Sequence, residues 1–286
     1  MCVKSFGQEF YPYESIRALK FADKTKISDR RALVEHIASQ LSQPSEMTRL
    51  RVAAKFVQRY LSGNRREIVP PPHLQPFARL VARSRHTPTQ IELLFHRVAK
   101  IDIVVGHMAR ELFYPVCIAG RAPDGVSSAE FAARNGAQLL STEPLLTREF
   151  ILEYSNTRWD FRNRSTIDRS LRILQGAGLI SRERQTELRD HPTAFRLSPH
   201  DVSLATFLYA LYDEFLPHAQ HSNLAIACDV LPVSDFARTL LLSPAQIEAH
   251  CKTARAQQLL AQQGRTLRLV FGDLDSLVDA LLSKAS

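Results

Sequence analysis

The chain lacks the features that mark a secreted or membrane protein. Its four cysteines are far apart and show no C-x-x-C spacing, which indicates reduced, partly buried thiols of a cytosolic protein. The first residues contain no hydrophobic segment typical of a signal peptide. Residues 98–119 are the most apolar stretch, but Lys, Asp, His, Arg and Glu side chains interrupt it. The sequence therefore predicts a cytoplasmic protein with no membrane partner.

Motifs of common enzyme classes are also absent. The sequence contains no GxxxxGK[ST] phosphate-binding loop, no GxGxxG dinucleotide motif, no HExxH zinc motif and no GxSxG nucleophile elbow. His218 and His221 have the i, i+3 spacing of one helix face, but no cysteine or carboxylate with ligand spacing accompanies them. The sequence therefore predicts neither an enzyme nor a cofactor or metal site.

Basic residues exceed acidic residues by eight, and this excess is concentrated in one part of the chain. Residues 45–100 contain eleven lysines and arginines but only three glutamates. Arg51, Lys55 and Arg59 recur at four-residue spacing on one predicted helix, and Arg65 and Arg66 follow. Because like charges at this spacing repel each other, an external anion would stabilise the helix, and nucleic acid is the first candidate. A solvated basic face explains the pattern equally well.

Residues 158–180 are the most informative about function. Ser165 is a predicted helix cap, and Ile167, Leu171 and Leu174 share one apolar face of the helix that follows. Gly176 and a second glycine end this helix, and a strand, a polar loop and a returning strand at 193–197 come next. Another amphipathic helix precedes it at 144–154. This order predicts a winged helix-turn-helix, whose second helix reads the DNA.

The outward side chains of the predicted reading helix indicate a contact with DNA. Ser165 and Thr166 point away from its apolar face together with Arg169 and Arg172, and the last three would enter a major groove. Arginines of the preceding turn and of the wing would contact phosphates; they are Arg162, Arg164, Arg182 and Arg184. The alternative is a winged helix used for protein contacts, in which these arginines are only solvated.

A second, weaker copy of the same pattern closes the chain. Ser243 caps a predicted helix that begins at Pro244, a hairpin surrounds Gly264, and Asp273 caps a last helix. The exposed face of this copy is less basic, which favours a structural role over a second reading head.

These patterns, together with scarce glycine, predict a mainly α protein. We expect a multi-helix architecture with a central winged helix-turn-helix and a second winged-helix-like C-terminal element. The expected segments are an N-terminal arm and helix at 1–44, a basic helical region at 45–140, the winged helix-turn-helix at 141–200 and the C-terminal helical or winged-helix-like region at 201–286.

Four segments of the chain resemble the BrxA family, small proteins encoded in BREX bacteriophage-exclusion operons. They are Ser45–Arg51, Leu93–Val116, Ser165–Ile180 and Asp273–Leu281, within a resemblance that runs from about Arg30 to Leu282. The resemblance implies a helical, DNA-binding protein in a machinery that marks host DNA and blocks phage replication. It implies double-stranded DNA and other phage-defence proteins as partners. The implied DNA-binding residues are Thr166, Arg169, Arg172, Arg51, Lys55 and Arg59.

Three other roles remain open from the sequence. A protein scaffold of the defence complex would have no affinity for nucleic acid. An RNA-binding protein would prefer single strands or A-form duplex, although the sequence lacks the stacking aromatics of RNA-recognition folds. A transcriptional regulator would need a defined operator and dimer symmetry.

Overall fold

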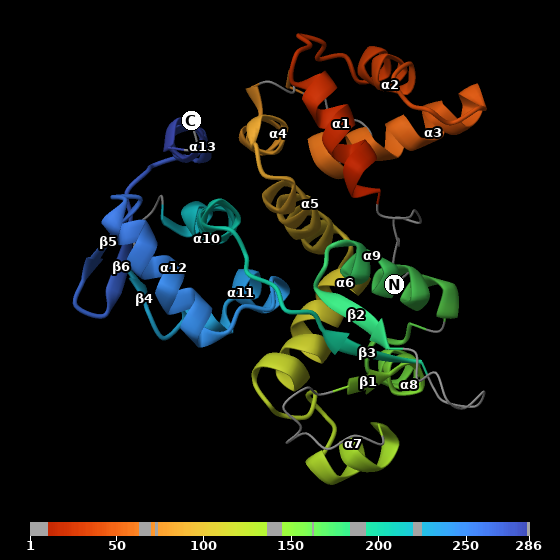
Figure 1. The fold of residues 1–286 in the computed structure, drawn as a ribbon, viewed down its shortest axis with the longest axis vertical. Helices are drawn as coiled ribbons and strands as arrows, with labels where there is room; N and C mark the ends of the chain where they lie inside the picture. The colour runs from red at the N-terminus through yellow and green to blue at the C-terminus, as the bar shows by residue number, and fades with distance from the viewer. Residues whose placement is uncertain are drawn as a thin grey trace. The chain divides into compact units, whose positions relative to one another are not determined.

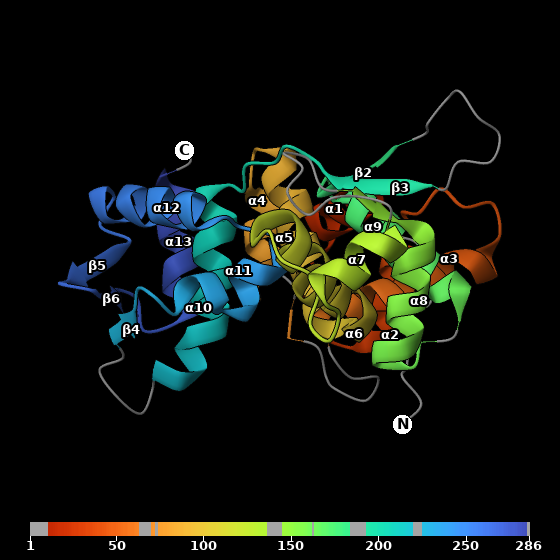
Figure 2. The same ribbon diagram turned by 90° about the horizontal axis from the view of Figure 1, so that it is seen from below.

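The computed structural model describes residues 11–62, 70–71, 74–135, 145–161, 163–183, 193–219 and 225–284. Helices make up most of these residues, and the strands among them form two antiparallel three-stranded sheets (Figures 1 and 2). The mainly α character predicted from the sequence is thus confirmed.

The chain forms two compact units, and each is assembled from separated segments. Unit 1 contains Asp102–Asp201 and Pro232–Ile247. Unit 2 contains Tyr11–Ile101, Val202–Leu231 and Glu248–Ser286. The predicted boundaries after residues 44, 140 and 200 divide the chain into consecutive segments, whereas each unit combines separated segments. These boundaries stay predictions.

Unit 1 contains the first sheet, whose strands lie side by side next to a pair of helices (Figure 1). Its strand order is β1-β3-β2, and β3 pairs Arg196 with Leu145 and Leu197 with Ile180. The elements of this region are α7 (Ser128–Asn135), β1 (Leu145–Thr147), α8 (Arg148–Trp159), α9 (Arg164–Gly176), β2 (Ile180–Glu183) and β3 (Ala194–Leu197). Unit 1 also contains α6 (Ile103–His107), η3 (Met108–Ile118) and α11 (Asp235–Thr239).

Most of the apolar stretch at residues 98–119 forms two successive helical parts. Asp102 begins α6, because its Oδ1 accepts a hydrogen bond from the Val105 N–H. The next part, η3, is π-helical and contains Pro115. The proline therefore neither ends the helix nor stands at its boundary, because the wider turn accommodates a residue that an α-helix would exclude.

Helix α9 is capped at its start by Asn163 and is followed at its end by Gly178 in a left-handed backbone conformation. The Asn163 Oδ1 accepts a hydrogen bond from the Ser165 N–H at 3.0 Å, so Asn163 is the cap and the predicted Ser165 cap is wrong. The apolar face predicted from the spacing is confirmed, because Ile167, Leu171 and Leu174 are buried. Gly178 adopts a φ of 75°, which ends the helix in the left-handed conformation that glycine tolerates.

Unit 2 contains most of the remaining helices and the second sheet. Its elements are α1 (Pro12–Ala22), α2 (Arg30–Ala38), α3 (Glu46–Phe56), η1 (Val57–Leu61), α4 (Pro76–Arg83), α5 (Thr87–Ile101), α10 (Leu204–Ala219), β4 (Ala225–Ala227), β5 (Leu260–Gln263), β6 (Thr266–Leu269) and α13 (Leu274–Lys284). Helix α10 packs against α5 and α13. Residues 206–212 of α10 are all buried, so this helix forms part of the core of unit 2.

The order of elements around the first sheet recurs later in the chain. The series α10, β4, α11, α12 (Pro244–Ala256), β5 and β6 repeats the helix and strand order of α7 to β3. The strand order β4-β6-β5 likewise repeats β1-β3-β2. Ser243 and Gln246 form a reciprocal capping box at the start of α12, with hydrogen bonds of 2.9 and 3.2 Å, which confirms the predicted Ser243 cap.

Tyr212 joins α10 to the loop ends of the second sheet. Its ring is fully buried, and its hydroxyl donates to the Leu259 carbonyl at 2.9 Å. The same hydroxyl accepts from the Val270 N–H at 2.8 Å and from the Phe271 N–H at 3.4 Å. Three backbone groups outside the ladder of the sheet therefore depend on one side-chain oxygen.

We expect the Tyr212→Phe substitution to lower the free energy of unfolding by about 2 kcal/mol, because it leaves one buried and two partly buried backbone groups without this partner. Urea denaturation of the full chain measures this loss. Tyr209→Phe is the matched control, since Tyr209 is also buried on α10 but its hydroxyl has no hydrogen bond among the described residues. Equal losses for the two variants would show that the Tyr212 hydrogen bonds contribute nothing.

Candidate nucleic-acid interface

Two helices of unit 1, α8 and α9, are joined by an ion pair near their N-terminal ends. Arg148 is the first residue of α8, and Asp168 lies in the second turn of α9. The Arg148 guanidinium donates two hydrogen bonds to the Asp168 carboxylate, at 2.9 and 2.7 Å. These bonds raise the pKa of Arg148 above its ordinary value, so this residue stays charged. The pair connects the start of α8 to the second turn of α9.

An aromatic cluster holds the other end of α8 and the turn that follows it. The Trp159 indole N–H donates to Glu111 Oε2 at 2.9 Å, and His107 Nδ1 contacts the other oxygen of the same carboxylate. The Trp159 ring also lies against Tyr154 and Phe161. Trp159 thereby connects the end of α8 and the turn that follows it to η3.

The outer surface of α9 is narrow, because this helix contacts both α8 and α6. Ser170 and Ile173 are buried in addition to the predicted apolar face. Of the side chains predicted to face outward, Ser165 and Arg172 are exposed, whereas Thr166 and Arg169 are half-buried. The structure therefore places these four residues along one side of α9, with unequal access to solvent.

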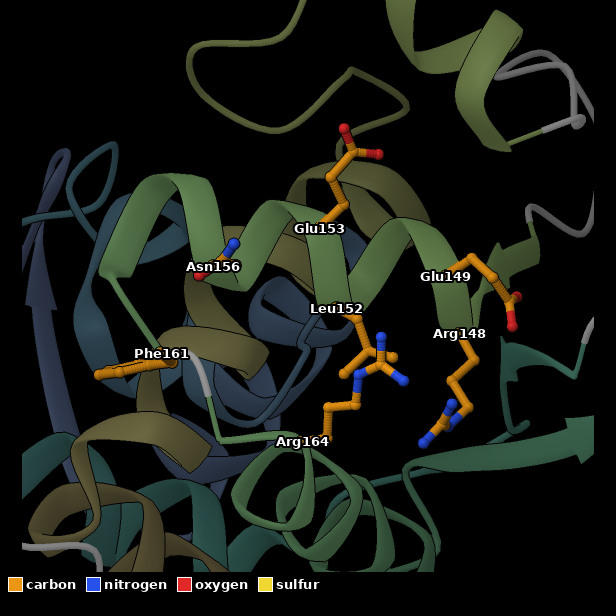
Figure 3. Close-up of a pocket in the computed structure, with 7 residues that line it drawn as sticks. All are labelled: Arg148, Glu149, Leu152, Glu153, Asn156, Phe161 and Arg164. Carbon is orange, nitrogen blue, oxygen red and sulfur yellow. The ribbon is translucent and has the colours of Figure 1, made fainter.

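A cavity of about 490 Å³ lies beside α8 and the start of α9 (Figure 3). Its lining residues are Arg148, Glu149, Leu152, Glu153, Asn156, Phe161 and Arg164. Figure 3 shows the Arg148 and Arg164 side chains on the same side of α8, between the two helices, whereas Glu153 points away from them. Glu153 instead lies 3.5 Å from the guanidinium of Arg134.

Among the described residues of the β2–β3 hairpin, Arg182 is an exposed arginine. Arg182 is exposed on β2 and donates to Thr193 Oγ1 at 3.1 Å. Arg196 on β3 pairs with Glu183 at 3.0 Å, which offsets its charge. Two predicted phosphate-binding residues of the turn and wing, Arg162 and Arg184, lie outside the described residues.

The predicted basic stripe of unit 2 is not continuous. Arg51 is exposed and Lys55 is half-buried on α3, but Arg59 is only 8% exposed. The helix changes from α to π geometry at Val57, so the four-residue spacing no longer keeps Arg59 on the outer face. Arg59 was therefore wrongly assigned to an exposed stripe. Arg65 and Arg66 lie outside the described residues.

Part of the positive charge of residues 45–100 is offset within unit 2. Arg79 lies 3.2 Å from Asp275 and 3.1 Å from Asp279. Arg83 pairs with Asp23 at 2.9 Å, and Lys100 pairs with Asp213 at 2.8 Å. The partners come from distant parts of the sequence, which is why a local count of charges overestimates the exposed basic surface.

The second sheet and its helix carry several exposed cations. Lys252 and Arg255 are exposed on α12, and Arg265 and Arg268 are exposed on the β5–β6 hairpin. The hairpin surrounds Gly264, as predicted, at a φ of 61°. The C-terminal region is thus more basic at its surface than the sequence interpretation allowed.

Other kinds of site find less support in the described residues. No three His, Cys, Asp or Glu side chains gather there in an arrangement that could hold a metal ion. Burial raises the pKa of the Cys117 thiol to about 12, so this thiol stays protonated at neutral pH. Within the described ranges, none of the helices has both the length and the apolar character needed to cross a bilayer.

No protein-family model matches this chain, and comparisons with curated proteins and with solved structures also give no match.

Arg148 is the main site residue that the sequence interpretation missed. The signal that could have revealed it is the Thr147 cap, whose Oγ1 accepts from the Phe150 N–H and makes Arg148 the first helical residue.

Proposed function

We propose that this protein binds duplex DNA through unit 1, with α8 and α9 acting as the helix-turn-helix of a winged-helix domain. The observation that carries the proposal is the combination of element order and strand order. A helix, a strand, two helices and a hairpin, with the first strand beside the last, are the arrangement expected of a winged helix. The arginine-bearing side of α9 is the side that the rest of unit 1 leaves accessible.

The proposed contacts fall into two chemical groups. Thr166, Arg169 and Arg172 of α9 enter the major groove, whose width admits an α-helix. The arginines of the turn and wing contact phosphates and fix the orientation of the protein on the duplex; they are Arg162, Arg164, Arg182 and Arg184. Ser165 is exposed beside them, and its hydroxyl donates to Asn163 Oδ1 at 2.7 Å in the free protein.

The proposed biological setting is bacteriophage defence. It rests on the resemblance of four segments to the BrxA family, of which Ser165–Ile180 covers α9 and the start of β2. In this setting the protein is an accessory DNA-binding member of a BREX-like assembly, and other phage-defence proteins are its partners. Arg51 and Lys55 offer a second, smaller basic surface on unit 2.

We expect binding to random-sequence duplex DNA to weaken about 150-fold between about 50 and 200 mM salt, which corresponds to four phosphate contacts at a slope of about 0.9 each. Fluorescence anisotropy of a labelled duplex measures this dependence. Single-stranded DNA and RNA duplex of the same length are measured in parallel. Salt-insensitive affinity, or a preference for RNA or single strands, would contradict the proposal. Co-purification with defence proteins and no nucleic-acid affinity would instead indicate a scaffold.

A further inference from the structure

The cavity beside α8 and the start of α9 places two guanidinium groups within reach of one small anion. Arg148 and Arg164 both line it and point into the same space between the helices (Figure 3). Its volume of about 490 Å³ lies within the range of about 300–1,000 Å³ that is usual for small-molecule sites. Arg164 is exposed and has no ion pair or hydrogen bond among the described residues. One of the two groups is thus available for a ligand.

The second guanidinium is occupied by a group that resembles a phosphate. The two oxygens of Asp168 accept from Arg148 in a fork, at 2.9 and 2.7 Å. Two non-bridging oxygens of a phosphodiester offer a guanidinium the same fork. About a third of each side chain is exposed, so solvent or a ligand can reach the pair. An ion pair of this exposure is weak enough to exchange partners.

We propose that Arg148 and Arg164 together hold one phosphodiester group of the bound DNA in this cavity, and that Asp168 weakens the contact by pairing with Arg148 in the free protein. This inference rests on the proposed function, because it names a contact and an internal competitor within the same interface.

The carboxylates that also line the cavity do not occupy the proposed position of the phosphate. Glu153 points away from both arginines and lies beside Arg134 (Figure 3). Glu149 is exposed and extends outward from the first turn of α8. Asp168 is therefore the carboxylate that competes with the phosphate for a guanidinium group. Because Arg148 keeps its charge, the exchange needs only a rotation of side chains and no transfer of a proton.

The test measures DNA binding of two variants that remove the same ion pair from opposite sides. Asp168→Asn frees Arg148 and is expected to tighten binding to a labelled random-sequence duplex about fivefold, which is about 1 kcal/mol. Arg148→Ala is expected to weaken binding and to lower the slope of log K against log salt by part of the value of about 0.9 that one phosphate contact contributes, because Arg164 still contacts the same phosphate. Thermal melting of both variants checks that the full chain still folds.

A second ion pair of unit 1 supplies the control. Arg121 and Asp124 lie 2.7 Å apart and are half-exposed. Asp124→Asn and Arg121→Ala change the net charge in the same way and are expected to alter affinity by less than about twofold. Control changes as large as those at Arg148 and Asp168 would overturn the proposal, because net charge alone would then explain them.

Three further outcomes have distinct meanings. If both Asp168→Asn and Arg148→Ala weaken binding, the pair only positions α9 and the phosphate contact is refuted. If the unmodified protein binds with the expected salt dependence but Arg148→Ala keeps the same slope, the contact is refuted and the proposed function stands. If the unmodified protein does not bind DNA at all, the proposed function fails.

Discussion

Replacing Asp213 with alanine is expected to lower the free energy of unfolding by about 3 kcal/mol, because it removes the carboxylate that His96 and Lys100 share inside unit 2. Asp213 Oδ2 on α10 lies 3.1 Å from His96 Nε2 and 2.8 Å from Lys100 Nζ, both on α5. The His96 side chain is 7% exposed, whereas that of Lys100 is 47% exposed and can turn toward water. The expected loss is therefore at the lower end of the range of about 3–5 kcal/mol that is typical when one partner of a buried ion pair is removed.

The control for this prediction is Asp229→Ala in the same unit. Asp229 is exposed, so its removal should change the free energy of unfolding by less than about 0.5 kcal/mol. Urea denaturation of both variants gives the comparison. Similar losses at the two positions would mean that the contact of α5 with α10 does not depend on Asp213.

The same carboxylate predicts a dependence of stability on pH. Burial alone would raise the pKa of Asp213, but the hydrogen bonds and charges of His96 and Lys100 outweigh burial and hold this pKa well below its usual value. A lowered folded pKa stabilises the protein above the unfolded pKa of about 3.9, and this stability is lost as pH falls through the folded value. The difference in unfolding free energy between the parent and Asp213→Asn should therefore shrink below about pH 4.

The local part of the fold could be predicted from the sequence. The apolar spacing of Ile167, Leu171 and Leu174 identified α9, and Ser243 with Pro244 identified the start of α12. Each of these signals lies within one or two turns of the element that it specifies. Ser165 was chosen as a cap although Asn163 does the capping, because both residue types can accept the same hydrogen bond.

Elements that depend on distant partners could not be predicted in this way. The strand β1 is only three residues long, and it forms because β3 pairs with it about fifty residues later in the chain. Helix α1 was interpreted as part of an arm, although Ile16 and Leu19 bury an apolar face against the rest of unit 2. Both segments pack against or pair with parts of the chain that are distant in the sequence, so the local sequence does not indicate their partners.

The candidate site shows the same division. The outward position of Arg172 follows from helix periodicity and is confirmed by its exposure. The role of Arg148 depends on Asp168, twenty residues away on another helix. The basic region of unit 2 was overestimated because Asp213, Asp275 and Asp279 meet its cations only after folding. Charge counts along a chain cannot distinguish solvated arginines from those that fold onto acids.

Substituting both Arg169 and Arg172 with alanine is expected to weaken binding to duplex DNA about a hundredfold, which is about 3 kcal/mol for two contacts to charged groups. Arg172 is exposed and Arg169 is half-buried, and neither lies on the apolar face formed by Ile167, Leu171 and Leu174. Alanine also favours the helix more than arginine does. Fluorescence anisotropy gives the affinity, and circular dichroism during thermal melting confirms that the variant folds.

Helix α12 offers a matched control at the same spacing. Lys252 and Arg255 are three residues apart and exposed, as Arg172 is on α9, and their double alanine variant removes the same charge. If α9 is the reading helix, the α12 variant loses only a few tenths of a kcal/mol of binding free energy through the general effect of its lower charge. This loss is less than about a fifth of the loss expected for the α9 variant. A larger loss for the α12 variant would move the DNA contact from the first winged-helix element to its repeat, because net charge is equal in both. Equal losses would mean that DNA binding follows the total charge of the chain and that no reading helix exists.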